Sequence, residues 1–225
     1  MYLGIYNDKH QILTANFPDF ENITRIPTGY YDKQIMCQHC DNVILGELET
    51  YSSKVLFHGL KDKKNEVKIV NTITPDGLRV LLLDNIDYSK FKLFLLSILW
   101  RASISNHPYF NEVSLGHHEE RIRLALLHGD PLKEDDYQAC MLLVKKNDEL
   151  PRDYILNPIK INQKIDPSFC FYMNGSFYFF STDKNESLEI YKHGSIKMSN
   201  KMEIPVIELD FVKGLLGRVW NIKLK

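Results

Sequence analysis

The chain has 225 residues, of which 44% are hydrophobic and 25% are charged, proportions that are ordinary for a globular protein. This length suffices for one large domain or two small ones. The formal net charge of −1 excludes an attraction of the whole chain to nucleic-acid phosphates, so any such contact needs a local basic patch.

The cellular compartment can be argued from the N-terminus and the cysteines. The chain does not open with a basic segment followed by an apolar run, so no signal peptide is predicted. Four cysteines in this context indicate reduced thiols or metal ligands rather than a disulfide framework. We therefore expect a cytoplasmic protein without a membrane partner.

The first 60 residues combine short strands with a cysteine turn and a helix. The runs MYLGIY and QILTANF predict short strands, and Pro18, Pro27 and Gly29 break the segment after them. A Cys37-Gln-His-Cys40 turn comes next. The segment NVILGELETYSSKVLFHG (42–59) then has apolar residues near one helical face, which predicts a helix ending near Gly59.

A β-hairpin and a central helix are predicted for residues 67–105. VKIVNTIT and LRVLLLDN are β-rich runs joined by Pro75-Asp76-Gly77, a turn sequence. DYSKFKLFLLSILWRASIS (87–105) comes after the hairpin, with Asp87 or Ser89 as its cap. It is apolar nearly all round, which is typical of a buried helix, and it is too short for the ~20 apolar residues of a membrane span.

Arg101 is the unusual residue of this central helix. We expect Ser97, Ile98 and Trp100 to be buried, which brings a cation to the edge of the core. Because an unpaired buried charge is costly, Arg101 must pair with a carboxylate or a carbonyl. Glu119 and Glu120 of the next helix are the predicted partners.

The second half of the chain is predicted to be rich in strands. HHEERIRLALLHG (117–129) predicts a helix that ends at Gly129 and has Ile122, Leu124 or Ala125, and Leu126 inward. YQACMLLVKKN fits a strand or a helix, and its flanking loops favour a strand. Asn174-Gly175 predicts a tight hairpin, since both residues tolerate positive φ angles.

Three further elements are expected near the C-terminus. His193-Gly194 indicates a second hairpin, and residues 203–209 form a strand with Pro205 near its edge. Residues 210–225 predict a short helix and a strand. The fold class is therefore α+β, with an N-terminal zinc-knuckle-like and helical part packed on a C-terminal antiparallel β-sheet. Residues 1–131 and 132–225 form two regions or one continuous domain.

The Cys37-x-x-Cys40 pair is the sharpest local signal in the chain. Two thiolates at this spacing, just before a helix, can bind one Zn²⁺, but a zinc site needs about four ligands. His10 and His58 are candidates for the others, without a spacing that supports them. The alternatives are a pair of ordinary thiols, an empty site, or a site completed by a second chain.

A second group of candidate site residues lies on the central helix and on the helix predicted after Gly116. One interpretation places Arg101, His117 and Glu120 around one cleft, as acid/base groups or metal ligands. The other is structural: acidic residues stabilise a helix N-terminus, and Glu119 pairs with Arg123 at i, i+4. No short-range spacing forces the cleft, so the structural interpretation is preferred.

The run GYYDKQIMCQHCDNVILGELETYSSKVLF resembles the second zinc knuckle and helix of a bacterial treble-clef family related to HNH endonucleases, often encoded near mobile elements and phage-defence genes. The segments DYSKFKLFLLSILWRASIS and VSLGHHEERIRLALLHGDP extend the resemblance over about residues 1–131. It implies that Cys37 and Cys40 bind zinc. The family's first CxxC and its Ser-His-Ile-Ile-Pro segment, which carries the nuclease histidine, would sit before MYLGIYNDKH, where this chain opens, so they have no counterpart here.

Two functions follow from these observations. The first is a nucleic-acid-associated protein of HNH-like treble-clef descent, a nuclease or nuclease remnant in phage defence or a mobile element. The second is a non-catalytic protein-interaction module of a defence or toxin–antitoxin system. In the second case, sheet edges in the C-terminal half would accept a strand from a protein partner. Zn²⁺ is the one cofactor expected.

Overall fold

The computed structural model describes residues 11–17, 22–30, 32, 35–58, 67–75, 77–146, 150, 153–162, 166–185 and 189–220. The strands are β1 Ile12–Ala15, β2 Thr24–Ile26, β3 Lys68–Ile73, β4 Arg79–Asp84, β5 Gln138–Val144, β6 Tyr154–Lys160, β7 Ser168–Met173, β8 Ser176–Ser181 and β9 Lys201–Ile207. The helices are η1 Cys40–Leu45, α1 Gly46–Ser53, η2 Lys54–His58, α2 Tyr88–Ile104, η3 Pro108–Phe110, α3 His118–His128, α4 Glu189–Gly194 and α5 Leu209–Trp220.

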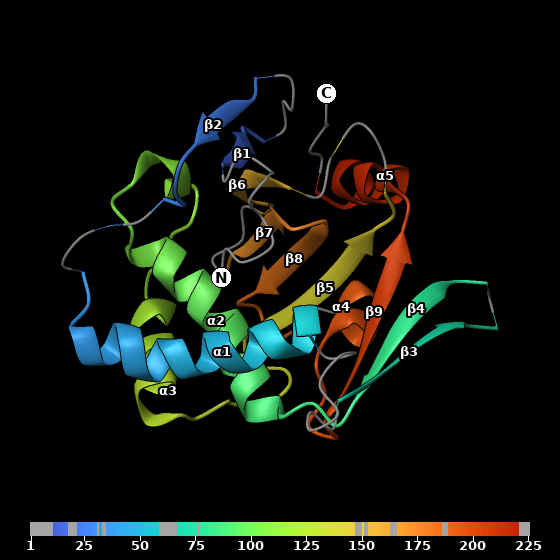
Figure 1. Ribbon diagram of the computed structural model, residues 1–225, viewed down its shortest axis with the longest axis horizontal. Helices are drawn as coiled ribbons and strands as arrows, with labels where there is room; N and C mark the ends of the chain where they lie inside the picture. The colour runs from blue at the N-terminus through green and yellow to red at the C-terminus, as the bar shows by residue number, and fades with distance from the viewer. Residues whose placement is uncertain are drawn as a thin grey trace.

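One mixed sheet contains the strands of both halves of the chain, in the order β2-β1-β6-β7-β8-β5-β9-β4-β3 (Figure 1). The neighbours β1–β6 and β5–β9 are parallel, whereas the β6–β7, β7–β8, β5–β8 and β4–β9 pairs are antiparallel. The α+β class is confirmed. The prediction that the C-terminal half provides the sheet edges is wrong, because β2 and β3 come from the N-terminal half.

Helices cover both faces of the sheet, and strand alternation decides which side chains meet which helices. On β5, Ala139 and Met141 belong to the core formed with α1, α2 and α3. Cys140 and Leu142 point to the other core, which contains residues of α4 and α5. All residues of β8 are buried for this reason, and the three-layer arrangement is visible in Figure 1.

Helix α2 is the buried helix that the sequence predicted. Asp87 caps it by accepting a hydrogen bond from the Lys90 amide at 3.0 Å. Ser97, Ile98 and Trp100 are buried, as expected. Among the described residues, no helix combines the length and apolar character that a bilayer span requires.

The hairpins at Asn174-Gly175 and at residues 74–78 are confirmed. Asn174 and Gly175 have φ angles of 51° and 74°, the left-handed conformation that a type I′ turn needs. Residues 138–144 form a strand, and Gly129 ends α3 with a φ of 69°. Asp76, the strand predicted for residues 1–6 and the one predicted at the C-terminus lie outside the described residues.

The hairpin predicted at His193-Gly194 is wrong, because residues 189–194 form helix α4. A Cβ on Gly194 would lie 2.9 Å from the carbonyl oxygen of Met141, so the glycine permits close contact with β5 rather than a turn. Ile190 and Tyr191 on α4 are buried in the core on that side. Apolar residues that look like a strand therefore cover the sheet as a helix.

Two smaller predictions also need correction. The first leaves Leu124 and Ala125 as alternatives, and the structure decides for Ala125, since Leu124 is 39% exposed and Ala125 is buried. Pro205 lies in an interior strand rather than near an edge, with β4 on one side and β5 on the other. The pairing between β5 and β9 begins at Leu143 and Val206, one residue after the proline. Pro205 has no backbone N–H to donate, and none is required at this position for the pairing with β5.

Lys92 is a buried cation on α2 that the sequence pattern did not predict. It is 2% exposed, and its Nζ lies 3.5 Å from the carbonyl oxygen of Glu134. Burial lowers the pKa of Lys92 to about 8, and the acidic residues Asp136 and Glu134 oppose this shift only in part. The core therefore tolerates the cation at an energetic cost.

We predict that Lys92→Met stabilises the protein more at pH 7 than at pH 10. The folded chain releases the Lys92 proton near pH 8 and the unfolded chain near pH 10.5. Unfolding therefore takes up a proton between these values, and wild-type stability rises with pH there. The advantage of the variant in free energy of unfolding should shrink by up to about 3 kcal/mol, measured by urea denaturation. Lys90→Met, at an exposed position of α2, is the control and should show no such trend.

Candidate functional site

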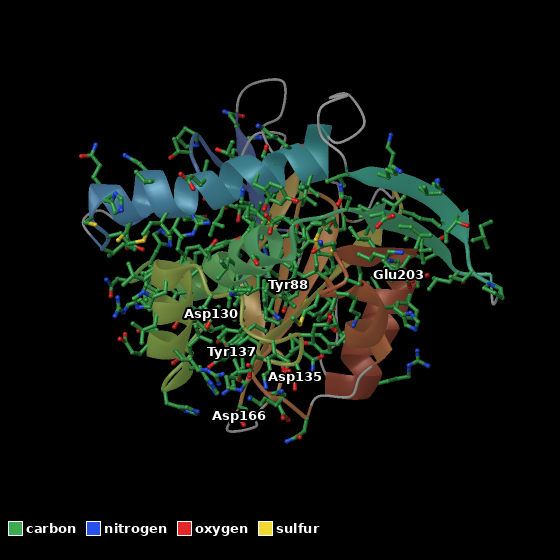
Figure 2. All side chains as sticks on the ribbon, turned by 90° about the horizontal axis from the view of Figure 1, so that it is seen from below. Tyr88, Asp130, Asp135, Tyr137, Asp166 and Glu203 are labelled. Atoms are coloured by element: carbon green, nitrogen blue, oxygen red, sulfur yellow. The ribbon has the colours of Figure 1, made fainter. Side chains whose placement is uncertain are left out.

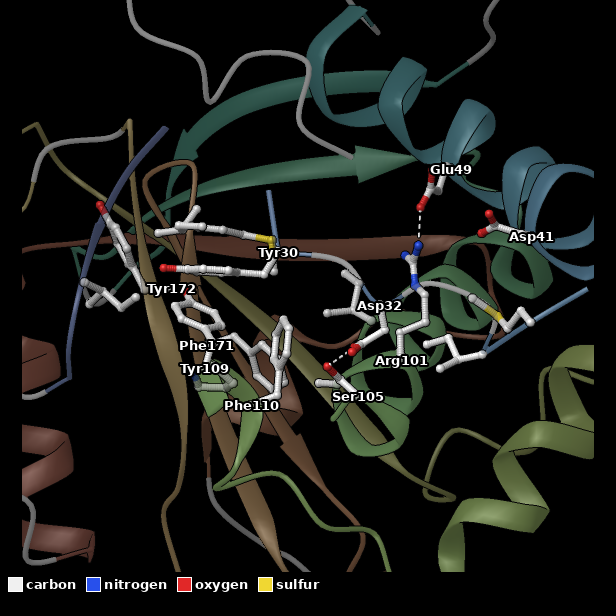
Figure 3. A pocket seen from close by; sticks show the side chains of 18 residues that line it. Tyr30, Asp32, Asp41, Glu49, Arg101, Ser105, Tyr109, Phe110, Phe171 and Tyr172 are labelled. Atoms are coloured by element: carbon white, nitrogen blue, oxygen red, sulfur yellow. Dashed lines mark hydrogen bonds and ion pairs between the residues drawn. The ribbon is translucent and has the colours of Figure 1, made fainter. Parts of the chain in front are cut away.

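A cavity of about 410 Å³ lies between the helical layer and the sheet (Figure 3). Helices α1 and α2 form one side, and strands β6 and β7 form the other. The segment 30–41 and the short helix η3 complete the lining. A cavity of this size with a few convergent polar groups is a candidate site for a small ligand or a single chemical group of a larger one.

Arg101 is the polar centre of the cavity. Its Nη1 donates to Glu49 Oε1 at 2.6 Å, and its Nε donates to the Ser97 carbonyl oxygen at 3.3 Å. The third nitrogen, Nη2, is buried without a hydrogen-bond partner among the described residues. Pairing of Arg101 with a carboxylate and a carbonyl is therefore confirmed, and one of its nitrogens is left for another group.

The predicted partners of Arg101 are wrong. Helix α1 packs on α2 and brings Glu49 to the guanidinium, whereas Glu119 accepts a hydrogen bond from Ser103 Oγ at 2.6 Å. The expected partner of Arg123 is Glu119, four residues before it. Arg123 pairs instead with Glu120, three residues before it, at 2.7 Å. The partner comes from 52 residues upstream, a separation at which no helical spacing applies.

Aromatic rings form one wall of the cavity. The ring centroids of Tyr30 and Tyr109 are 4.3 Å apart, and those of Tyr109 and Phe110 are 4.9 Å apart with the planes edge to face. Phe171 of β7, which belongs to the core under the helices α1, α2 and α3, also lines the cavity (Figure 3). Such a wall can hold a flat ligand by stacking.

Two further carboxylates contribute to the lining. Asp32 accepts a hydrogen bond from Ser105 Oγ, at the end of α2. Asp41 also lines the cavity, at the start of η1 (Figure 3). The site thus contains three carboxylates, those of Asp32, Asp41 and Glu49, and one guanidinium, that of Arg101. This balance favours a neutral or hydrogen-bond-donating ligand over a phosphate.

The cysteine turn lies next to the cavity. The Cys40 amide donates to Cys37 Sγ at 3.4 Å, just before η1. Cys37 accepts this backbone hydrogen bond and a second one from the Cys40 thiol, and both lower the pKa of Cys37. Because the Cys40 thiol donates its proton to that second bond, the pKa of Cys40 is raised. Met36 and Asp41, on either side of the turn, both line the cavity.

The described part of the chain supplies no third metal ligand to these cysteines. His10 lies outside the described residues, and of His58 only the backbone is described, at the end of η2. Cys140 and Cys170 are buried in the sheet beneath α4 and α5, where burial raises the pKa of both thiols. Two of about four zinc ligands are therefore in place among the described residues.

Arg101, His117 and Glu120 do not share one cleft. Arg101 lines the cavity, whereas neither His117 nor Glu120 does. His117 lies instead with His118 and with Asp166, its Nε2 being 3.8 Å from Asp166 Oδ1. His118 Nε2 is 3.0 Å from the same oxygen. Burial lowers the pKa of His118, against the opposing effect of its hydrogen bond to Asp166.

Sequence reasoning missed most of the polar and aromatic residues that complete these sites. They are distant in sequence from the groups they contact, so no motif identifies them. The residues concerned are Tyr30, Asp32, Glu49, Tyr109 and Asp166. The sequence contains an indirect signal for Glu49 alone, through the expectation that Arg101 needs a carboxylate or carbonyl partner.

Comparisons of the chain with protein-family models, with curated protein sequences and with solved structures give no match. The resemblance to the treble-clef family therefore remains a prediction from the sequence. Function has to be argued from the geometry of the cavity and its neighbouring groups.

We predict that Glu49→Gln lowers the free energy of unfolding by about 2 kcal/mol. Exposed ion pairs contribute ~0–1 kcal/mol, and breaking a buried ion pair costs ~3–5 kcal/mol. About a quarter of each side chain is exposed, 27% for Glu49 and 23% for Arg101, which places the pair between these limits. Glu47→Gln, at an exposed position of α1, is the matched control in denaturant unfolding. Equal effects of the two variants would contradict the interpretation.

We predict that Cys37 reacts with iodoacetamide before the other cysteines, because it is exposed and its pKa is lowered. Cys140 and Cys170 are buried and should react only after unfolding. Peptide mass spectrometry after short labelling times identifies the modified residue, and Cys37→Ser should remove the fast phase. Rapid labelling of Cys140 in the folded protein would contradict the structure.

Proposed function

We propose that the chain is a nucleic-acid-associated binding protein whose cavity accepts a nucleobase. The observation that carries this proposal is the pairing of an aromatic wall with the half-buried guanidinium of Arg101, whose buried Nη2 has no hydrogen-bond partner among the described residues. The proposal concerns binding and assigns no reaction to the cavity.

The aromatic wall supports stacking of a flat heterocycle. Stacking of a base on an aromatic side chain contributes about 1–3 kcal/mol and tolerates any base. Tyr30 packs on His107 and on Tyr109, with ring centroids 4.4 Å and 4.3 Å apart, and η3 holds the backbone of Tyr109 because His107 Nδ1 accepts a hydrogen bond from the Tyr109 amide at 3.1 Å. The wall is thus held in position before the ligand arrives.

The polar groups favour guanine among the bases. Guanine presents the acceptors O6 and N7, which suit an arginine fork, and an exocyclic amino donor, which suits a carboxylate. Arg101 Nη2 has no partner among the described residues, and Asp41 lines the same cavity. The phosphate of a nucleotide would remain outside, since three carboxylates line the cavity and one of them, Glu49, pairs with the guanidinium.

The base could come from a free nucleoside or from a single-stranded nucleic acid. Single-stranded bases are the usual targets of base-specific recognition in RNA, since they can leave the stack. Both sources present the same heterocycle to the cavity. The net charge of −1 supports the smaller ligand, whereas the treble-clef resemblance supports the polymer.

Zinc binding by Cys37 and Cys40 remains part of the proposal. With two of about four ligands in the described part of the chain, the fit is incomplete. A metal held there would stiffen the turn between Met36 and Asp41, at the wall of the cavity. The binding of a base does not depend on it.

Calorimetric titration with guanosine, cytidine and short single-stranded oligo(dG) tests the proposal. We expect guanosine to bind more tightly than cytidine, and Arg101→Met to weaken guanosine binding at least ~10-fold, in line with the ~1–3 kcal/mol of an arginine–guanine contact. Tyr109→Leu removes stacking without touching the ion pair. Arg79→Met, an arginine on β4 away from the cavity, is the control.

The outcomes separate the two sources. Tighter binding of the oligonucleotide than of guanosine supports the polymer, and equal affinity per base supports the nucleoside. Absence of binding of every probe to a folded wild-type protein would overturn the proposal. Unfolding curves of the variants show whether a loss reflects the site or the stability.

A second candidate function is a protein-interaction module, and the edge strand β3 supports it. Val70 and Ile73 on this strand are 54% and 68% exposed. An extended segment of a partner could add to β3 by backbone hydrogen bonds. This candidate would gain weight if the cavity bound no base.

A further inference from the structure

Two adjacent histidines and an aspartate meet outside the cavity. His118 is the first residue of α3 and His117 precedes it, with ring centroids 3.8 Å apart. Asp166, just before β7, brings its Oδ1 to 3.0 Å from His118 Nε2 and 3.8 Å from His117 Nε2. Three atoms that can ligate a metal thus lie within 4.8 Å of one another.

These separations match those between the ligands of a small divalent cation. With metal–ligand bonds of about 2.0–2.1 Å and tetrahedral angles, two ligand atoms are about 3.3 Å apart. The two distances measured to Asp166 Oδ1 lie on either side of this value. With all three atoms within 4.8 Å of one another, the cluster has the dimensions of a three-ligand site.

Tyr137 holds His118 in the orientation that a metal ligand needs. Its hydroxyl lies 3.2 Å from His118 Nδ1, so an Nδ1–H can donate to the tyrosine when Nε2 gives up its hydrogen bond to Asp166 and binds a metal. Ligating histidines commonly use their second nitrogen in this way. Tyr137 is 3% exposed and has a φ of 50°, a strained conformation that the surrounding structure has to enforce.

The surroundings permit a cation to approach. The side chains of His117 and Asp166 are 69% and 43% exposed, and Figure 2 shows Asp166 at the periphery of the molecule. The nearby Arg121 is paired with Asp136 at 3.2 Å, and Lys184 is paired with the same carboxylate at 2.6 Å. The one carboxylate of Asp136 therefore offsets one of these two positive charges, and the exposed Asp166 provides the negative charge at the site itself.

We propose that His117, His118 and Asp166 bind one divalent transition-metal ion of the zinc type, with a solvent-facing coordination position. Two imidazoles and one carboxylate suit Zn²⁺, Co²⁺, Ni²⁺ or Fe²⁺ better than Mg²⁺ or Ca²⁺, which prefer all-oxygen sites. Three protein ligands with an open position form the arrangement found where a metal activates water. The site is independent of the base-binding cavity.

Cobalt titration of a Cys37→Ser/Cys40→Ser protein tests the proposal. The protein carries no affinity tag and is first treated with a chelator. Co²⁺ reports nitrogen and oxygen ligands by its visible absorption, and Zn²⁺ competition in calorimetry gives the stoichiometry. We expect one ion per chain, and at least ~10-fold weaker binding in His117→Gln and in Asp166→Asn, both of which change exposed side chains.

His128→Gln, at the opposite end of α3, is the matched control and should bind as tightly as the parent. His118→Gln should also lose the ion, and its unfolding curve shows whether the partly buried position tolerates the change. Absence of an ion at micromolar metal would overturn the proposal. Affinity that is unchanged in both His117→Gln and Asp166→Asn would overturn it as well.

Discussion

The burial of α2 is the constraint on which the other features depend. A helix that is apolar nearly all round has to be covered on several sides, and α1, α3 and the sheet provide that cover. The same burial brings the Arg101 cation to the edge of the core, where it needs compensation. Glu49 on α1 meets this need, since the packing of α1 on α2 brings its carboxylate to the guanidinium.

The cavity follows from this arrangement. Arg101 cannot be covered by apolar side chains as the rest of α2 is, because its guanidinium has more donors than Glu49 and the Ser97 carbonyl accept. Tyr30, Asp32 and Asp41 add an aromatic ring and two carboxylates to the lining. A polar centre with aromatic walls is the result, and it lies beside the cysteine turn.

The two faces of the sheet have different chemical character. The face under α4 and α5 contains buried thiols and aromatic rings, and its cysteines are protonated structural residues. The face under α1, α2 and α3 includes the buried Lys92, and the cavity opens beside that core. The histidine–aspartate cluster forms where α3 begins beside the loop before β7. The cavity, the buried lysine and the histidine–aspartate cluster therefore all lie on the side of the sheet that α1, α2 and α3 cover.

The sequence by itself determined the elements whose signals are local. The Asn174-Gly175 turn follows from two residues that accept positive φ, and α2 follows from its cap and its apolar pattern. The need of Arg101 for a partner was also predictable, because desolvation of a charge depends on burial and not on the identity of the partner.

Only the tertiary structure decided which residues meet. Glu49 reaches Arg101 and Asp166 reaches His118 across 52 and 48 residues, and no pattern of period 2 or 3.6 encodes such contacts. Residues 189–194 look like a strand but form a helix, because packing of Gly194 against β5 outweighs local preference. Local energies select elements over a few residues, whereas charge pairing and close packing select partners through the whole fold.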